Sequence, residues 1–272
     1  MPATPLDPYR IANGKGFRLD RFDAGARPFS SGDKTSDRAR LTELSTHLDE
    51  QQDIFYAEQS RKLLVILQGM DTSGKDGTVR GVFRSFDPLG LRVVGFKAPT
   101  SEEKARDYLW RVHAQVPRAG EIAVFNRSHY EDVLITRVHG WIDAAECERR
   151  YRQIRHFESL LAETGTTLVK CFLHISKDEQ KSRLEARLAD PQKHWKFDPN
   201  DLAERRHWDA YMDAYQDAIA ATATPEAPWH VIAADSKTHR NLMVAEILRE
   251  TFARLKPAYP PSAPGLDKLK VE

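Results

Sequence analysis

The stretch GMDTSGKDGT, residues 69–78, contains two glycines and a lysine at the spacing G-x-x-x-x-G-K. Loops of this pattern hold phosphate with successive backbone N–H groups and a helix N-terminus, while the lysine neutralises phosphate charge. Glycine lets the backbone approach the anion closely. We therefore predict phosphate binding by Gly69, Gly74, Lys75, Asp76, Gly77 and Thr78.

Two aspartates distinguish this stretch from the usual nucleotide-binding loop. Asp76 occupies the position after Lys75, where a Ser or Thr hydroxyl normally binds Mg²⁺. Asp71 lies two residues after the first glycine. A carboxylate repels phosphate, so both acids make sense only if metal ions lie between them and the anion. Because Mg²⁺ takes oxygen ligands from both groups, the sequence predicts Mg²⁺ as a cofactor.

A second polar cluster, FNRSHYEDV at residues 125–133, includes Arg127, Glu131 and Asp132. It begins at the end of an apolar run, and open parallel sheets bind ligands at the carboxyl ends of their strands. Arg127 can clamp phosphate oxygens and Asp132 can hold Mg²⁺. Taken alone, these residues would also fit a helix N-terminus with favourable acids and a solvated arginine.

The elements that must position these residues alternate between apolar runs and helical patterns. We predict strands at residues 62–69, 91–98, 121–128, 166–176 and 229–236. We predict helices at residues 40–59, 78–86, 101–112, 144–163, 177–188, 201–221 and 239–255. This alternation is typical of an α/β fold with a parallel sheet flanked by helices and right-handed crossovers.

The two ends of the chain differ from the part between them. Residues 1–36 are rich in Gly, Pro, Ser and Asp and are predicted to form an irregular lead-in. Residues 257–272 are rich in proline and are predicted to be a loosely attached tail. The intervening residues 37–256 are expected to form one domain, without a linker that divides it.

The composition excludes several classes of protein. The 272 residues are 40% hydrophobic and 30% charged, so the chain is not expected to be disordered throughout. Its net charge is +1, so no overall positive charge indicates nucleic-acid binding. The two cysteines are too few for a disulfide framework. No apolar run approaches the length of a membrane span, and no secretory leader is recognisable. We therefore expect a cytoplasmic protein without membrane or nucleic-acid partners.

The two polar stretches together resemble motifs of the type-2 polyphosphate kinases. The stretch at residues 69–78 is similar to the first motif of that family, with its acid inside the loop and K-D-G in place of K-[ST]. FNRSHYEDV is similar to the second motif, and the likeness extends over about residues 17–256. The Glu131-Asp132 pair resembles the single-domain subgroup that phosphorylates both AMP and ADP.

This resemblance implies a P-loop kinase fold like that of thymidylate kinase, with a helical lid at about residues 180–200. It implies Mg²⁺-dependent, reversible phosphate transfer between inorganic polyphosphate and AMP or ADP, in a homo-oligomer of four or two subunits. The implied catalytic residues are Asp71, Lys75, Arg127 and Asp132, with Asp71 and Asp132 as metal ligands. Arg183 and Arg187 are the lid arginines expected to close over the substrate, although Lys181, Lys193 and Lys196 could serve equally well.

Two other functions fit the same residues. An ATP-dependent nucleoside monophosphate kinase would share the fold, but the acid inside the loop and the missing hydroxyl after Lys75 disfavour it. A polyphosphate- or nucleotide-binding regulator without turnover is the alternative outside enzymes. The sequence leaves open the preference between AMP and ADP, base selectivity, polyphosphate length, net direction and the number of subunits.

Overall fold

The computed structural model describes residues 4–266, 269 and 271 of the chain. Its centre is a six-stranded sheet in the order β1-β6-β5-β2-β4-β3. The strands are β1 (Arg10–Ile11), β2 (Lys62–Gln68), β3 (Leu91–Gly95), β4 (Ile122–Asn126), β5 (Thr166–His174) and β6 (Trp229–Ala233). Strands β2 to β6 run parallel, so their carboxyl ends lie at one edge.

All five predicted strands are present, each ending slightly earlier than predicted. The apolar runs of β2, β4, β5 and β6 match burial on both faces, which the crossover helices of a parallel sheet impose, whereas the edge strand β3 is only partly buried. The sixth strand, β1, was not predicted. It has two residues, pairs antiparallel with β6, and lies within the segment predicted to be irregular. A pairing this short depends on the neighbouring strand and leaves no periodic pattern in the sequence.

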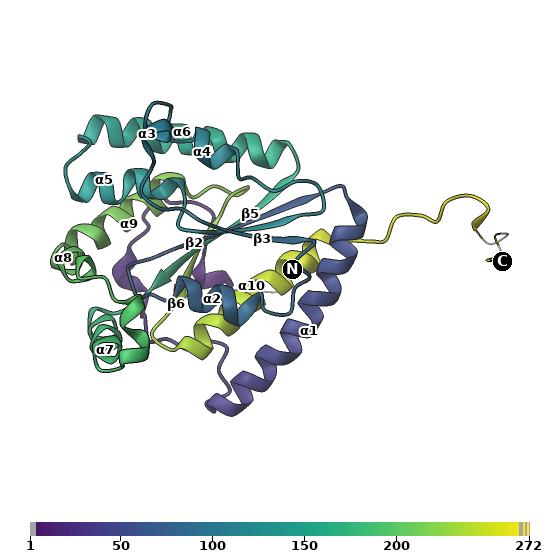
Figure 1. Cartoon of the computed structure of the whole chain (residues 1–272), viewed down its shortest axis with the longest axis horizontal. Coiled ribbons are helices and arrows are strands. Elements are labelled where there is room, and N and C mark those ends of the chain that lie inside the picture. The colour runs from purple at the N-terminus through teal and green to yellow at the C-terminus, as the bar shows by residue number, and fades with distance from the viewer. Residues whose placement is uncertain (1–3, 267–268, 270, 272) are drawn as a thin grey trace.

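Helices cover both faces of the sheet (Figure 1). The α-helices are α1 (Lys34–Glu58), α2 (Lys75–Val82), α3 (Ser101–Lys104), α4 (Trp110–His113), α5 (Ile135–Val138), α6 (Ala144–Glu163), α7 (Lys177–Leu188), α8 (Asn200–Arg206), α9 (Trp208–Thr222) and α10 (Lys237–Leu255). Short 3-10 helices are η1 (Asp7–Tyr9), η2 (Leu19–Arg21), η3 (His129–Val133) and η4 (Pro191–Lys196). Helices α1, α2 and α10 lie on one face, α4, α5 and α6 lie on the other, and α7 and α8 gather at one end.

Two predicted helices are wrong as continuous elements. The helix predicted at residues 101–112 is two single turns, α3 and α4, because the Asp107 carboxylate accepts a hydrogen bond from the Leu109 backbone and starts a new turn. The helix predicted at residues 201–221 is interrupted at His207 between α8 and α9. There Glu204 lies 3.0 Å from His139 and accepts a 2.6 Å hydrogen bond from Tyr211, contacts that a sequence pattern cannot reveal.

The long helices α1 and α10 begin and end near the predicted domain divisions, but the packed region starts earlier, because Leu6 and Leu19 are buried in the core and β1 belongs to the sheet. Helix α1 begins at Lys34, where the Asp33 side chain caps its first turn, and α10 ends at Leu255. The predicted divisions after residues 36 and 256 lie close to these points and stay a prediction. Figure 1 shows the segment after α10 extending away from the rest of the chain. Within residues 4–266, no helix is long and apolar enough to cross a membrane.

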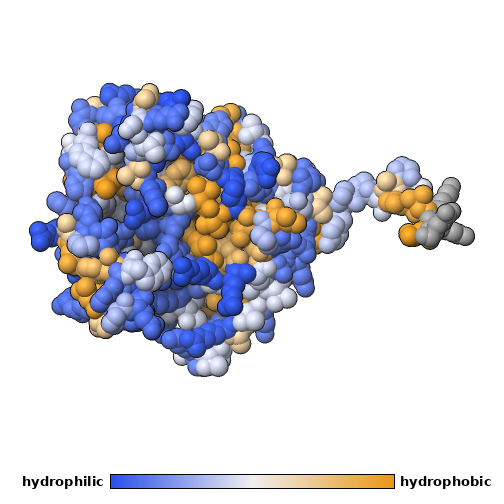
Figure 2. Space-filling view, in the orientation of Figure 1, coloured by the Kyte–Doolittle hydropathy of each residue, from blue (hydrophilic) through white to orange (hydrophobic). Residues whose placement is uncertain are grey.

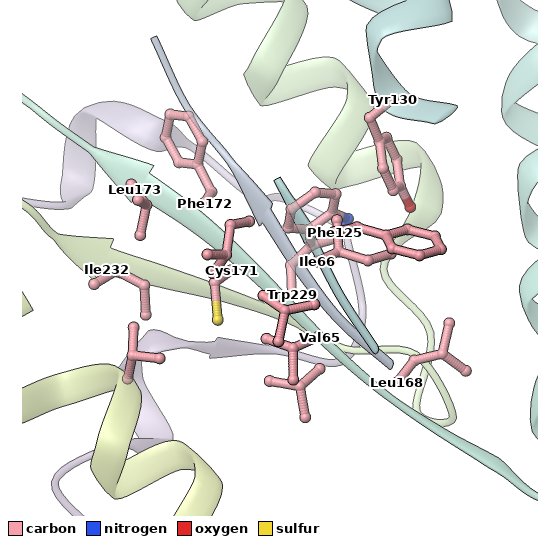
Figure 3. Packing of buried hydrophobic residues seen from close by; sticks show 14 of the residues in the cluster. Val65, Ile66, Phe125, Tyr130, Leu168, Cys171, Phe172, Leu173, Trp229 and Ile232 are labelled. Atoms are coloured by element: carbon pink, nitrogen blue, oxygen red, sulfur yellow. The ribbon is translucent and has the colours of Figure 1, made fainter. Parts of the chain in front are cut away.

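The core fills both sides of the sheet with apolar side chains from neighbouring strands. Val65 and Ile66 of β2, Phe125 of β4 and Cys171 of β5 are all fully buried (Figure 3). Trp229 of β6 packs edge to face on Tyr130, with ring centroids 4.6 Å apart. Tyr130 belongs to the FNRSHYEDV stretch, so packing in the core directly supports a candidate functional segment.

A buried histidine predicts sensitivity to acid. Burial lowers the pKa of His230 on β6 from 6.5 to about 4. As pH falls below about 6.5, the unfolded chain binds the proton first, so stability is lost progressively down to about pH 4. We expect a loss of about 3 kcal/mol from this residue. Denaturant unfolding between pH 7 and 4 should show a smaller loss for His230→Gln than for wild type; equal losses would contradict the assignment.

Candidate active site

The phosphate loop, residues 69–75, joins β2 to α2 at the carboxyl edge of the sheet. Gly74 caps α2 with φ of 106°, a conformation that favours glycine. Lys75 is only 8% exposed, and its Nζ donates hydrogen bonds to the carbonyl oxygens of Gly69 at 2.7 Å and Met70 at 3.2 Å. The lysine therefore folds back over the loop that precedes it.

Charges around Lys75 come from both candidate motifs. Burial lowers the pKa of Lys75 and Arg127 lowers it further, whereas Asp71, Glu131 and Asp76 raise it. Two cations and three acids therefore act on one another at this edge of the sheet. Such a concentration of charge in a desolvated loop is typical of functional sites.

Both aspartates of the phosphate loop have protein partners. Asp71 forms a 2.6 Å ion pair with Arg127, and Asp76 accepts a 2.6 Å hydrogen bond from Asn126. The expectation that these acids make sense only with metal ions is therefore too narrow. Arg127, which has φ of 64°, and Asn126 link the second motif (residues 125–133) to the phosphate loop. The structure thus joins two stretches that lie about fifty residues apart in the sequence.

The adjacent acids Glu131 and Asp132 have different surroundings. Burial raises the pKa of Glu131, while Arg127 and Lys75 lower it, which places Glu131 with the phosphate loop. Asp132 is instead 3.8 Å from Arg111. Burial raises the pKa of Asp132 to about 6, although Arg111 and Arg150 act against the rise. Asp132 was predicted to act with Asp71, but of the two adjacent acids it is Glu131 whose charge acts on Lys75.

Asp132 lines a cavity of about 610 Å³ formed by residues around α3, α4, η3 and α6. One Asp132 carboxylate oxygen is buried without a hydrogen-bond partner among the described residues. The cavity is also lined by the basic and aromatic residues Lys104, Arg106, Tyr108, Arg111 and Arg150, and by the acids Glu103, Asp107 and Glu146. Its size is that of a small-molecule site, and its lining carries charges of both signs.

Gly77 and Thr78, predicted to bind phosphate, lie in the first turns of α2. Gly77 faces α10, where the Arg240 guanidinium leaves no room for a side chain. Thr78 is fully buried, and its hydroxyl donates to the Gly74 carbonyl oxygen at 3.2 Å. These contacts hold α2 in place, and phosphate binding by the two residues stays a prediction.

Arg183 does not lie where the sequence analysis expected it. The expectation was that it closes over the substrate from the lid, but it is 7% exposed and lies against the backbone of the loop. Its guanidinium donates to the carbonyl oxygens of Thr72 at 2.9 Å, Ser73 at 3.0 Å and Ala234 at 2.7 Å. These bonds occupy its N–H groups, so Arg183 braces the phosphate loop against β6.

The rest of the predicted lid comprises the end of α7 and η4. Arg187 lies 3.4 Å from Asp201 and donates to the Lys196 carbonyl oxygen at 3.2 Å, so it joins α7 to η4 and to α8. Lys193 pairs with Asp190 at 2.6 Å. These contacts lie within the predicted lid and adjoining α8, and substrate contact by Arg187 or the lid lysines stays a prediction.

A buried ion pair that sequence reasoning missed supports the second motif. Lys170 of β5 and Glu158 of α6 are fully buried and lie 2.6 Å apart. Tyr130 donates its hydroxyl proton to Glu158 at 2.8 Å, and Lys170 donates to the Tyr130 oxygen at 3.0 Å. A lysine in the middle of an apolar strand was the available signal. The network holds Tyr130 in place between Arg127 and Glu131.

Oxygen atoms that could bind a cation remain unpaired in the loop and at the end of β2. Within the described residues, Thr72 Oγ1 and Ser73 Oγ of the loop and Gln68 Oε1 of β2 are buried without hydrogen-bond partners. No group of three or more His, Cys, Asp or Glu side chains with metal-binding geometry is found in the described part of the chain. A cation here would therefore take ligands from single carboxylates and neutral oxygens, which suits a hard cation.

Comparisons with known proteins identify close relatives. The family described as Polyphosphate kinase 2 (PPK2) matches residues 31–259. An AMP/ADP-polyphosphate phosphotransferase of Meiothermus ruber is 48% identical over 97% of this chain and 99% of its own length. An ADP-polyphosphate phosphotransferase of Rhodopseudomonas palustris is 38% identical over 96% and 94%. The crystal structure of polyphosphate kinase 2 from Arthrobacter aurescens has a TM-score of 0.92 and 48% identity, covering 96% of this chain and 93% of that one.

These matches extend well beyond the two motifs. They include the sheet, the flanking helices and the lid segment, so the expected P-loop kinase fold is confirmed. The family that the two motifs resembled is confirmed as well. The chain belongs to the polyphosphate kinase 2 family.

Proposed function

We propose that this protein transfers phosphate reversibly between inorganic polyphosphate and AMP or ADP. The observation that carries the proposal is the 2.6 Å pair between Asp71 and Arg127, which brings the acid of the phosphate loop and the arginine of the second motif together beside Lys75. The printed activities of the relatives from Meiothermus ruber and Rhodopseudomonas palustris support the same substrates. An ATP-dependent kinase or a regulator without turnover has no comparable support.

The reaction requires little acid–base chemistry. An oxygen of the terminal phosphate of AMP or ADP attacks the terminal phosphorus of polyphosphate. The bond from that phosphorus to the bridging oxygen breaks, and polyphosphate leaves one unit shorter. Since the nucleophile is already an anion, the protein must mainly position two polyanions and neutralise their charge. Lys75 and Arg127 are the cations that we assign to this task.

The phosphate loop is assigned to the polyphosphate donor. Gly69 and Gly74 allow its backbone N–H groups to approach phosphate oxygens, and Lys75 turns from the Gly69 and Met70 carbonyls toward the bound anion. Asp76, held by Asn126, supports the first turn of α2. In the reverse direction the same loop would bind the shortened polyphosphate product.

Mg²⁺ is the proposed cofactor, with Asp71 and Asp132 as its carboxylate ligands. The unpaired Asp132 oxygen and the unpaired Thr72 and Ser73 hydroxyls are hard oxygen donors, as Mg²⁺ requires. Bound there, Mg²⁺ would supply positive charge to phosphate oxygens of donor and acceptor. Glu131 is a further candidate ligand because it shares its surroundings with Asp71 and Lys75.

The cavity beside Asp132 is the proposed acceptor site. A nucleoside mono- or diphosphate would place its phosphates near Arg111 and Arg150 and its base near Tyr108. The cavity volume, about 610 Å³, is in the range of small-molecule sites. Lid residues Arg187, Lys181, Lys193 and Lys196 are assigned to later contact with the polyanions.

A homo-oligomer of four or two subunits is the proposed assembly. Strand β3 is an edge of the sheet, and Val93 on it is 46% exposed while the neighbouring Leu89 is 71% exposed. Figure 2 shows hydrophobic residues gathered on this side of the molecule. An exposed apolar edge strand is an unusual liability in a monomer, which supports its burial by another subunit. We place the enzyme in the cytoplasm, without nucleic-acid or membrane partners.

The decisive experiment measures product formation from AMP and from ADP with long-chain polyphosphate and Mg²⁺, with no ATP present. ADP and ATP are the expected products, and EDTA should abolish their formation. A parallel reaction with ATP and AMP should give little product. Formation only from ATP would favour the nucleoside monophosphate kinase, whereas polyphosphate binding without any product would favour the regulator.

A further inference from the structure

Arg240, in the first turn of α10, is a buried cation behind the phosphate loop. It is 3% exposed, and its Nη1 lies 3.3 Å from the Ser73 carbonyl oxygen. Its Nε and Nη2 donate to the Asn241 side-chain oxygen at 3.2 and 2.9 Å. Among the residues that the structure describes, no carboxylate forms an ion pair with this guanidinium. All of its partners are neutral oxygen atoms.

The loop and α2 leave room for this side chain. A Cβ atom at Gly74 would lie 1.8 Å from Arg240 Nη1, and one at Gly77 would lie 2.9 Å from Nη2. At Gly81, one turn further along α2, a Cβ atom would lie 2.0 Å from the Asn241 amide nitrogen. The glycines therefore bring the guanidinium into contact with the backbone of the phosphate loop.

The charge of Arg240 is not matched by its surroundings. Burial, together with the smaller effect of Arg183, lowers the pKa of Arg240 to about 9, and no acid acts against them. The group still remains protonated near neutral pH. Burying an uncompensated charge lowers the stability of the fold. The Arg240 guanidinium also lies at the N-terminus of α2, which is the positive end of that helix dipole. A neutral side chain of similar length could fill the space without this cost, so packing alone does not account for arginine.

We propose that Arg240 is a positioning residue for the polyphosphate donor, and that the bound polyphosphate is the counterion its buried charge lacks. The positive charge of Arg240 attracts the bound polyphosphate across the Ser73–Gly74 backbone. Little solvent reaches this region, so the attraction is only weakly screened. The inference rests on the proposed function and deepens it, because donor affinity then depends on a residue outside both motifs. Arg183 braces the same loop, but its charge is paired with Glu179 at 2.7 Å.

Three variants of the full-length protein test the proposal. Arg240→Met removes the charge, and Arg240→Lys keeps it. Arg249→Met is the matched control, because Arg249 lies on the same helix but is partly exposed and paired with Glu246. Thermal unfolding is measured without ligand and with long-chain polyphosphate. Steady-state kinetics give KM separately for polyphosphate and for AMP.

The unliganded Arg240→Met protein should melt at the wild-type temperature or above, since an unmatched buried charge has been removed. Its polyphosphate-induced rise in Tm should fall below about half the wild-type rise. KM for polyphosphate should increase at least about tenfold, and KM for AMP should change less than about threefold. Arg240→Lys should recover most of both effects, and Arg249→Met should behave like wild type.

A residue that merely supports the fold would give the opposite pattern. Failure of Arg240→Met to fold, or a lower Tm with unchanged KM for polyphosphate, would overturn the proposal. The same holds if Arg240→Lys is as impaired as Arg240→Met, because charge would then not be the property that matters. A wild-type protein that makes product only from ATP would overturn the proposed function and this inference with it. Wild-type use of polyphosphate beside an unaffected Arg240→Met would overturn the inference alone.

Discussion

Replacing Lys75 with methionine is expected to lower turnover with polyphosphate at least about a hundredfold while the protein stays folded. The Lys75 ammonium is nearly buried at the N-terminus of α2, where it can neutralise phosphate in a poorly solvated loop. Methionine preserves most of the side-chain volume but removes the charge and the hydrogen bonds to the Gly69 and Met70 carbonyls. The measurement is the initial rate of ADP formation from AMP.

Lys62→Met provides the matched control for this experiment. Lys62 begins β2, whose other end leads into the phosphate loop, and its Nζ donates to the Thr164 carbonyl oxygen at an exposed position. The control should keep a wild-type rate. Circular dichroism and Tm should establish that both variants are folded. A folded Lys75→Met protein with a near-wild-type rate would remove Lys75 from the proposed mechanism.

Replacing Asp132 with asparagine should also reduce turnover at least about a hundredfold. The change keeps the shape of the side chain but removes the negative charge proposed to bind Mg²⁺ in the acceptor cavity. Stability should not fall at pH 8, because burial disfavours the ionised carboxylate and raises the pKa of Asp132 to about 6. Activity is measured across a range of Mg²⁺ concentrations, and unfolding is measured in EDTA.

Two further variants, Glu131→Gln and Asp213→Asn, are compared with Asp132→Asn. Asp213 is exposed on α9, so its variant controls for loss of a carboxylate elsewhere. Glu131 lies with Lys75 and Arg127, so Glu131→Gln reports whether the acid beside the phosphate loop is the one that matters. Loss of activity in Glu131→Gln with normal activity in Asp132→Asn would move the metal and catalytic role from Asp132 to Glu131.

The pair between Asp71 and Arg127 ties the phosphate loop to the second motif, and each side chain neutralises the charge of the other. We expect polyphosphate to compete with Asp71 for Arg127, because both present anionic oxygens to the same guanidinium.

The parallel α/β architecture and the position of the phosphate loop were predictable from the sequence, and its two motifs resembled the family that the comparisons confirm. Four of the five predicted strands follow from continuous apolar runs, because a strand buried on both faces requires them along its own length, and the edge strand β3 shows the same run although it is only partly buried. The loop at residues 69–75 follows from glycine and lysine spacing, because phosphate binding by backbone N–H groups is local. These features need only neighbouring residues to be recognised.

Only the tertiary structure decided what the charged residues contact. Arg183 is spaced like a lid arginine but lies under the loop, and Arg240 reaches the same loop from a helix more than 160 residues away. Glu131 and Asp132 are neighbours in sequence yet have different charged neighbours. The physical reason is that the energy of a charge depends on its burial and its partners. Both are set by the packing of distant elements, which periodicity and spacing do not encode.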